Sequence, residues 1–292
     1  MKHFVYILIL LLLGENFFLI AQEAEKEFVS ETFSSIHIVN GHSTETLKKR
    51  QFRYIIGHRF GDALGELGGV QTAYGFDNAA DIRFGFDIGL TDKLLVGVAR
   101  LKGISAPYRS ILEGFAKYRF LSQTKDNNIP VSLAFTSTIY GTYMKADEDV
   151  SLVTHFPKFT HRLAYGSQLT IARKFHPRLS VALMPTYVHR NYVRTNDQNG
   201  VFATGGAINL KLTKTFGVVA EYFHSFAQAG LREDYTNSLG FALEFLTNGH
   251  VFSINITNAR GFGELQYIAL NTANWDEGQF RIGFSITRTF KY

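Results

Sequence analysis

The chain of 292 residues contains no cysteine and only 5 prolines. The lack of cysteine excludes disulfide bonds, thiolate metal ligands, a cysteine nucleophile and a lipid anchor attached through an N-terminal cysteine. After residue 22 the sequence also lacks any apolar run long enough for a transmembrane helix and any apolar repeat of helical period. Extended strands joined by turns remain as the main local structures.

The charged residues give a formal net charge of +5, but they do not form a basic surface that the sequence can identify. The basic residues are spread along the chain, and their longest run is Lys48 to Arg50. No basic helix and no nucleic-acid-binding motif is present. We therefore expect no nucleic-acid partner.

Aromatic residues and glycine are abundant. The chain has 27 Phe, 14 Tyr and 26 Gly, with aromatics at 14% of all residues. Aromatic side chains favour strands, whereas glycine favours tight turns. The mean hydropathy of −0.02 is also typical of chains in which apolar and polar positions alternate.

The C-terminal stretch, residues 279–292, shows the alternation most clearly. In steps of two, one face carries Phe280, Ile282, Phe284, Ile286, Arg288, Phe290 and Tyr292. The other face carries Arg281, Gly283, Ser285, Thr287, Thr289 and Lys291. Neighbouring side chains on a strand point to opposite faces, so this stretch is predicted to be a strand with one apolar face.

The same unit recurs about twelve times along the chain. The predicted strands are 52–60, 81–90, 94–101, 111–121, 131–140, 162–175, 179–188, 202–212, 216–224, 239–245, 252–257 and 279–292. Short connections follow the even strands and longer ones follow the odd strands, which is typical of barrels with short periplasmic turns and long outer loops. Pro185 lies inside a predicted strand and lacks an N–H, so we expect a bulge there.

These patterns predict an all-β fold, a transmembrane antiparallel up-and-down β-barrel of about 12 strands in the outer membrane of a Gram-negative bacterium. A secreted β-sandwich or a lipocalin-like barrel would also alternate. The aromatic-rich apolar face, the loop-length pattern and the charged opposite face favour the membrane barrel. Outer-membrane lipid and the barrel-assembly machinery are then expected partners, with Phe290 and Tyr292 as the membrane-insertion signal.

The N-terminus is predicted to direct export. A charged start and an apolar run, residues 4–13, precede a candidate cleavage point after Ala21. The expected organisation is a signal peptide at 1–21, a periplasmic N-terminal extension at 22–51 and the barrel at 52–292. The extension could be a linker or could enter the mouth of the barrel, and its sequence favours neither.

Several motifs resemble a family of outer-membrane β-barrels from Bacteroidota, the domain of unknown function 5777. They are NGHSTETLKK at residues 40–49, HRFG at 58–61, DIRFGFDIGLTDKLLVGVAR at 81–100 and GFAKYRFLSQ at 114–123, together with the aromatic C-terminus. The resemblance covers most of the mature chain. It implies an outer-membrane barrel, and it implies neither an established activity nor catalytic residues.

Charged side chains on the polar faces are the candidate functional residues, because these faces should line the lumen. The set is Arg53, Arg59, Asp81, Arg83, Asp87, Glu113, Lys117, Arg119, Glu221, Glu244 and Arg281. In water they would bias which ions or solutes pass. Paired with one another, they would instead form a plug in a narrow lumen.

The sequence thus supports two functions. The first is porin-like passage of small solutes or ions through a charged lumen. The second is a closed structural or interaction barrel that docks a periplasmic or surface partner. A filled lumen with an ordered N-terminal segment would favour the second.

Metal binding and catalysis find little support. His37, His42 and His58 are close in sequence but form no recognised ligand motif. His224 and Ser225 are adjacent and would lie on opposite faces of a strand, which is wrong for a nucleophile and its base. We expect no metal, no cofactor and no catalytic residue, and the chain is predicted not to be an enzyme.

Overall fold

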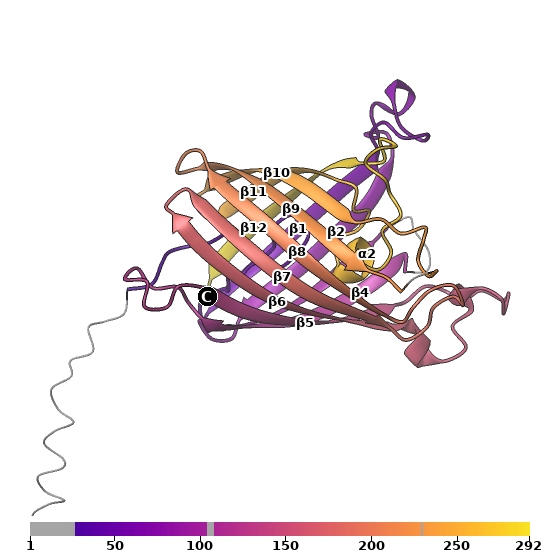
Figure 1. Cartoon of the computed structure of the whole chain (residues 1–292), viewed down its shortest axis with the longest axis horizontal. Helices are drawn as coiled ribbons and strands as arrows, with labels where there is room; N and C mark the ends of the chain where they lie inside the picture. Colours follow the sequence, from indigo (N-terminus) through magenta and orange to yellow (C-terminus); the bar gives the residue numbers. More distant parts are fainter. Residues whose placement is uncertain (1–26, 104–107, 229) are drawn as a thin grey trace, which may run out of the picture.

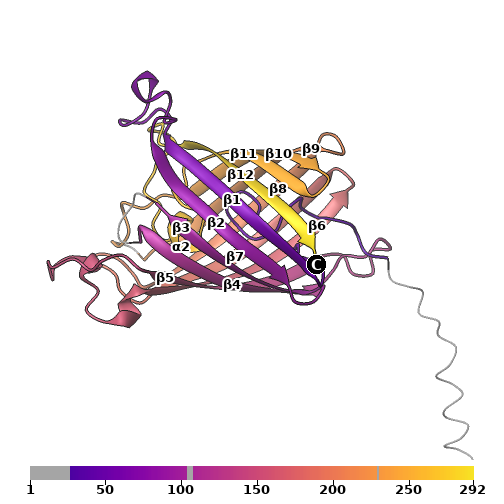
Figure 2. The same ribbon diagram turned by 180° about the vertical axis from the view of Figure 1, so that it is seen from behind.

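The computed structural model describes residues 27–103, 108–228 and 230–292, and the predicted signal peptide lies outside them. Within this part of the chain, twelve strands form one closed antiparallel barrel in sequence order, and the last strand pairs with the first (Figures 1 and 2). The strands are β1 (Gln51–Asp62), β2 (Ala79–Gly89), β3 (Leu94–Lys102), β4 (Ser110–Leu121), β5 (Ser132–Thr142), β6 (Leu163–His176), β7 (Leu179–Arg190), β8 (Gly200–Lys211), β9 (Phe216–Phe226), β10 (Ser238–Thr247), β11 (His250–Thr257) and β12 (Arg281–Lys291).

Helical structure in the described residues is confined to short pieces. They are the helix α2 (Glu264–Tyr267) and the 3-10 turns η2 (Val70–Thr72), η3 (Val153–His155) and η4 (Phe159–Arg162). None of the helices in the described part of the chain has the length and apolar character needed to cross a membrane.

The alternation of side chains confirms the predicted fold class. In β2, Phe84 and Phe86 face outward and are 45% and 43% exposed, whereas Arg83 and Asp87 face the lumen and are 2% and 1% exposed. The same alternation of exposed and buried positions recurs in the other strands. An outer surface of Phe, Leu, Ile and Tyr is what a lipid bilayer stabilises.

The prediction of a bulge at Pro185 is wrong. β7 pairs with β8 through Met184, Pro185 and Thr186 without a register shift. On the other side, the ladder between β6 and β7 omits Pro185 and then resumes in the same register. The missing N–H therefore removes a local contact with β6 and does not require an extra residue. Register shifts occur instead after Arg59 in β1 and near the ends of β4 and β6.

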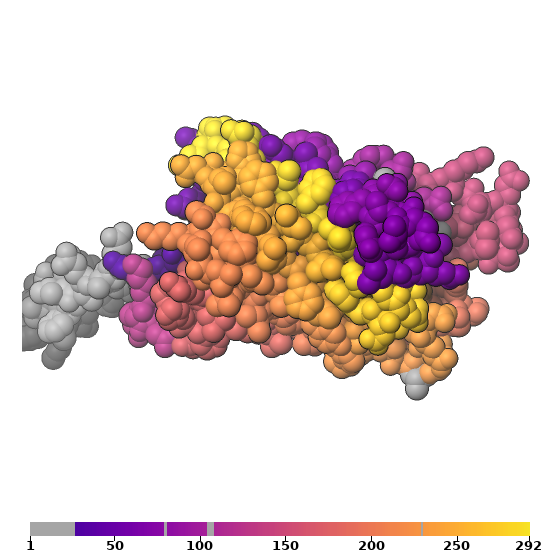
Figure 3. Space-filling model, turned by 90° about the horizontal axis from the view of Figure 1, so that it is seen from above, coloured from indigo at the N-terminus to yellow at the C-terminus, as the bar shows by residue number. Residues whose placement is uncertain are grey.

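The two ends of the barrel differ in their connections. Residues 177–178 and 248–249 make tight turns at the end that holds the C-terminus, whereas 143–162 and 258–280 are long loops at the opposite end (Figure 1). The predicted alternation fails at one place, because the turn 122–131 is longer than the loop 103–109. The loop 63–78, in purple, and the loop 143–162, in rose, extend toward the same end in Figure 3.

Residues 27–50 form a hairpin inside the barrel, which we call the lumen hairpin. It begins at the short-turn end, where Phe28 bridges Thr124. The chain reverses where the Ile38 N–H donates to the Gly41 carbonyl at 2.7 Å. It then returns to the same end, where the Lys49 N–H donates to Asp92. Of the two arrangements that the sequence left open, this segment adopts the one inside the barrel.

The loop 258–280 enters the lumen from the opposite end. Its residues Phe262, Leu265, Tyr267 and Ile268 are buried and pack in one apolar cluster with Phe33, Ile38 and Val39 of the lumen hairpin and with inward side chains of the wall. This loop carries α2 close to β6 and β7. Together the hairpin and the loop fill the interior of the barrel.

We predict that Gly89→Ala displaces the returning limb of the lumen hairpin. A Cβ at position 89 would lie 2.2 Å from the Lys48 carbonyl oxygen and 2.9 Å from that of Leu47. Both contacts are with backbone, so relief requires the hairpin to move, at a cost of about 1–3 kcal/mol. Gly206→Ala is the matched control, because its Cβ would meet nothing closer than 4.0 Å. Thermal unfolding in detergent would show a lower midpoint for Gly89→Ala alone, and equal midpoints would contradict the described packing.

Candidate functional site

The tip of the lumen hairpin is bound by a single carboxylate of the barrel wall. Glu221 of β9 accepts the backbone N–H groups of Val39 at 3.2 Å, Asn40 at 2.8 Å and Gly41 at 3.0 Å. The side chain is 1% exposed. Successive N–H groups that converge on one anion form a strong, charge-assisted contact. Glu221 therefore fixes both the position and the conformation of the turn.

Arg59 of β1 joins the hairpin tip to the outer loop. Its guanidinium donates to Asn40 Oδ1 at 2.6 Å and to the carbonyl oxygens of Ala259, at 3.1 Å, and Gly261. The same group lies 4.2 Å from the centre of the Phe262 ring. Because Arg59 is fully buried, these contacts replace its water shell. One wall residue thus binds the elements that enter from both ends.

His42 makes the second junction between the hairpin and the outer loop. Its Nε2 lies 3.3 Å from Glu264 Oε1, at the start of α2. Its backbone carbonyl accepts hydrogen bonds from Gln168 at 2.7 Å and Thr170 at 2.8 Å. Glu264 also accepts the hydroxyl of Tyr140 and returns its own N–H to that oxygen at 2.9 Å. The hairpin, the outer loop and the wall meet in this network.

Burial and hydrogen bonding together set the protonation of this junction. Burial lowers the pKa of His42 to about 4, although the hydrogen bond and charge of Glu264 act in the opposite direction. Burial raises the pKa of Glu264, but the hydrogen bonds from His42 and Tyr140 outweigh it and hold that pKa at about 2. At neutral pH the pair is therefore a neutral imidazole that donates to a carboxylate.

Nearer the short-turn end, two cations of the wall bind the limbs of the hairpin. Lys117 of β4 donates to the carbonyl oxygens of Ile36 and Ser43, both at 2.9 Å, and so joins the two limbs. Arg53 of β1 donates to Ser35 at 2.9 Å while its guanidinium lies 2.6 Å from Asp87. Both cations are buried, and both have the partners that buried charges require.

The predicted lumen-lining residues are all brought to the inner surface, and ten of the eleven are 0–3% exposed. Arg83 forms a bidentate pair with Glu113 at 2.5 and 3.1 Å. Arg281 lies 3.0 Å from Asp81. Arg119, the less buried one, lies 4.0 Å from Glu45 of the hairpin, and Glu244 lines a small cavity. In this structure ten of the eleven charges are paired with one another or bound to the hairpin, whereas Glu244 makes no ion pair with a described residue.

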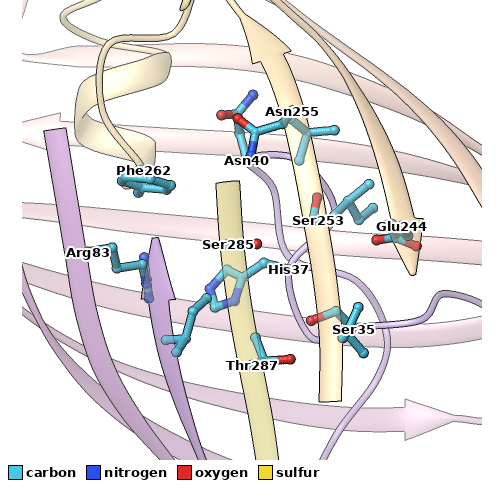
Figure 4. Close-up of a pocket in the computed structure, with 14 residues that line it drawn as sticks. Ser35, His37, Asn40, Arg83, Glu244, Ser253, Asn255, Phe262, Ser285 and Thr287 are labelled. Atoms are coloured by element: carbon cyan, nitrogen blue, oxygen red, sulfur yellow. The ribbon is translucent and has the colours of Figure 1, made fainter. Parts of the chain in front are cut away.

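The space left beside the hairpin is small. Between the hairpin and strands β10 to β12 the cavity has a volume of about 20 Å³, which is enough for about one water molecule. Figure 4 shows His37 in this gap, with Ser253, Asn255, Ser285 and Thr287 around it. The lumen is closed at this level.

Of the remaining candidates, His37 and His42 lie in this interior, whereas the others lie on the outside of the barrel. The rings of His37 and His42 are 4.5 Å apart, but His58 contacts Phe60 and Phe284 on the outer face. Among the described residues no group of three metal-ligating side chains comes together. Of the predicted insertion signal, Phe290 stacks on Phe52 at 4.9 Å and Tyr292 is 69% exposed.

Sequence reasoning missed much of the site. The sequence motif at residues 40–49 carries the family resemblance, and His42 is also one of three histidines weighed as metal ligands, but neither pattern predicts that the wall and the loop bind Asn40 and His42. No sequence pattern identifies Glu264 and Tyr140, because a carboxylate in a long loop and a tyrosine on a strand are both common. The signal that could have identified Asn40 and His42 is the short polar motif at residues 40–49, which follows an apolar stretch.

The fold and the site define an outer-membrane β-barrel of the porin-like type whose lumen is filled by its own N-terminal hairpin and its last outer loop. The family model described as membrane bound beta barrel domain, the domain of unknown function 5777, matches residues 33–290, so the chain belongs to this family. The match begins within the lumen hairpin. The resemblance read from the sequence motifs is therefore confirmed.

A search of solved structures found a similar fold in the KdgM porin. The KdgM porin is 10% identical with a TM-score of 0.50, and the match covers 82% of this chain and 99% of that one. The NanC porin matches with 10% identity, a TM-score of 0.49 and coverage of 82% and 100%. The Pseudomonas putida toluene transporter TodX matches with 9% identity, a TM-score of 0.41 and coverage of 92% and 100%. A search of curated proteins found no match.

We predict that Glu221→Gln releases the hairpin tip. The amide keeps the shape of the carboxylate but removes its charge and turns an –NH2 group toward backbone N–H donors. Loss of these hydrogen bonds should weaken docking by at least about 2 kcal/mol. Hydrogen exchange of residues 36–44 should then be at least tenfold faster than in the wild type.

Glu244→Gln is the matched control for that experiment. Glu244 also faces the lumen and is 3% exposed, but its Oε2 has no hydrogen-bond partner among the described residues. Its substitution removes the same charge without removing a contact of the hairpin tip. Equal exchange rates in the two variants would contradict the role given to Glu221.

Acidification is also predicted to loosen the hairpin. His42 released into water has a pKa of about 6.5, against about 4 when docked. The released state therefore binds more protons between these values, and docking weakens as the pH falls below 6.5, by up to about 2 kcal/mol at pH 5. Below pH 4.5 the lowered pKa of Glu264 adds to the effect in the same direction.

The measurement is hydrogen exchange of residues 36–44 at pH 7.5 and pH 5, corrected for intrinsic exchange rates. Protection should decrease at pH 5 in the wild type. It should decrease less in His42→Gln, which keeps a polar side chain but cannot be protonated in this range. His37, Lys117 and Arg83 also face this imidazole and are unchanged in the variant. Equal protection at both pH values would refute the prediction.

Proposed function

We propose that this chain is an outer-membrane channel for small polar solutes that is held closed by its lumen hairpin. The observation that carries the proposal is the polarity of the wall behind the hairpin. Arg53, Lys117 and Glu221 bind the hairpin through polar contacts, and a released hairpin would leave these groups facing a water-filled path. Twelve strands place the barrel between small filled barrels and wide porins.

The hairpin is suited to be a movable closure. Both of its limbs lead to the short-turn end, where residue 50 continues directly into β1 and Phe28 contacts the turn after β4. No strand of the barrel has to separate for the hairpin to leave in that direction. The polar contacts that would break can be replaced by water. The apolar packing of Phe33, Ile38 and Val39 on the loop 258–280 would also be lost. Opening therefore requires a shift of the hairpin and not an opening of the wall.

Catalysis is not part of the proposal. His224 contacts Asn237, with 3.1 Å between Nδ1 and Nδ2, whereas Ser225 donates its hydroxyl to the Ile268 carbonyl at 3.5 Å. The two side chains have different partners and do not form a nucleophile and base. We propose a channel and not an enzyme.

A second candidate function is a closed barrel that docks a periplasmic or surface partner. The filled lumen and the ordered hairpin favour it. The wall binds the tip of the hairpin through Glu221 and Arg59, and it binds the returning limb through Lys117. Under this proposal the hairpin is permanent, and the partner would bind to an end of the barrel. The two functions differ in whether a loosened hairpin allows ions to pass.

The test uses a disulfide that locks the hairpin tip to the wall. A Cβ at position 240 would lie 2.8 Å from Val39 Cγ1. A disulfide places each Cβ about 3 Å from the partner sulfur, so Val39→Cys with Gly240→Cys matches the required geometry. The chain has no cysteine of its own to interfere.

We expect Glu221→Gln to conduct in planar bilayers more often than the wild type. Adding the oxidised 39–240 disulfide to Glu221→Gln should abolish conductance, and a reductant should restore it. The single variants Val39→Cys and Gly240→Cys in the Glu221→Gln background control for the substitutions themselves. If Glu221→Gln is folded and exchanges rapidly at 36–44 but stays silent, the channel is ruled out and the closed barrel remains.

A further inference from the structure

The outer end of the barrel contains a cavity that lies above the closed lumen. Its volume is about 680 Å³. Five outer loops contribute to it, and we call it the vestibule. Its lining includes Tyr108, Arg109, Arg190, Arg194, Asp197 and Arg260. Leu270 and Thr272 belong to the same loop that fills the lumen below.

The lining of the vestibule is richer in cations than in anions. It contains four arginines and two aspartates. One of the aspartates, Asp197, is already neutralised, because Arg190 and Arg232 each lie 2.7 Å from its Oδ1. Burial raises the pKa of Asp197, but these arginines outweigh it and hold that pKa at about 2. At neutral pH Asp197 is therefore a carboxylate whose charge is already used by Arg190 and Arg232.

Two further arginines stand exposed at the vestibule. Arg109 and Arg194 are both exposed. Neither makes an ion pair with a carboxylate of the described residues. Asp147 is the acid that remains on the lining, and it is exposed. The vestibule therefore offers unneutralised positive charge to a solute.

Residues that line the same cavity also carry buried donors without partners in the described protein. The hydroxyl of Tyr108, in a side chain that is 1% exposed, has no hydrogen-bond partner among the described residues. The Nε atoms of Arg190 and Arg260 are also buried and unpartnered in that part of the chain. Burial raises the pKa of Tyr108 to about 12, even though Arg190 acts against it, so the hydroxyl remains a donor. Buried donors without acceptors are costly, so a ligand that supplied an acceptor to them would gain affinity.

The apolar part of the lining indicates the rest of the ligand. Tyr108, Tyr192 and Tyr235 lie beside Leu152 and Leu270. Aromatic faces pack against the C–H faces of rings, whereas arginines bind carboxylates in bidentate geometry. The volume exceeds that of a single ion and is within the range of small-molecule sites.

We propose that the vestibule is a binding site for a ring-shaped solute that carries a carboxylate, of the sugar-acid class. The carboxylate is bound by Arg109 and Arg194, and the Tyr108 hydroxyl donates to an oxygen of the solute. The solute is free in the medium, and it is bound while the lumen below is closed. The inference goes beyond the channel proposal and does not require the hairpin to move.

The test uses D-glucuronate and D-glucose, which share a ring and differ in the carboxylate. Saturation-transfer NMR on the full protein in detergent free of lipopolysaccharide measures binding without requiring conductance. We expect glucuronate to bind at least tenfold more tightly than glucose. The Arg109→Gln/Arg194→Gln double variant should lose that preference. Arg178→Gln, an exposed arginine at the opposite end, is the matched control and should keep it.

Tyr108→Phe separates binding from folding. Because the hydroxyl has no partner in the described protein, its removal should leave the thermal midpoint unchanged or higher while weakening glucuronate binding severalfold. A lower midpoint would show that the hydroxyl already has an acceptor, and it would overturn the argument from unpartnered donors.

Three other outcomes would overturn the proposal. They are equal binding of glucose and glucuronate, an unchanged preference in the double arginine variant, and loss of preference in Arg178→Gln. The last measurement is binding of lipopolysaccharide to the wild type and to the arginine variants. If the arginine variants lose lipopolysaccharide binding while glucuronate does not bind the wild type, the site binds an anionic lipid headgroup and not a free solute. None of these results depends on whether the barrel conducts.

Discussion

The closed ring of hydrogen bonds between β1 and β12 is the constraint on which the rest of this structure depends. A bilayer offers no partners for backbone N–H and C=O groups, so a sheet can cross it only if it has no edge. Closure then imposes alternation on each strand, because one face meets lipid and the other meets the lumen. At the seam the register is continuous from Phe52, which pairs with Phe290, to Arg59, which pairs with Gly283, and it shifts after Arg59.

Closure also creates an interior that has to be filled with water or with protein. Here protein fills it from both ends, and the wall supplies the groups that make this possible. Glu221 binds N–H groups of a turn, Lys117 binds carbonyl oxygens, and Arg59 binds both the hairpin and the outer loop. These are contacts between a charged wall and the polar backbone of the filling segment. Such contacts hold the hairpin in one position, yet water can compete for each of them once the hairpin moves.

The division of the interior into two levels follows from the loop 258–280. Its apolar residues pack on the lumen hairpin, whereas its Arg260, Leu270 and Thr272 form part of the vestibule above. One loop therefore separates a closed lumen from an open outer cavity. The junction of His42 with Glu264 lies on the lumen side of this loop.

The sequence alone determined the barrel, the approximate position of each strand and the face on which each lumen charge lies. It could do so because the period of two is local, so that Arg83 and Phe84 must point to opposite sides wherever the strand is placed. It did not determine the partners of those charges. The pairing of Arg53 with Asp87 depends on the register of two strands, and the docking of His42 on Glu264 joins residues from the two ends of the chain. Only the tertiary structure decided that the lumen is filled, because a polar face on a strand is equally suited to water and to a polar segment of the same chain.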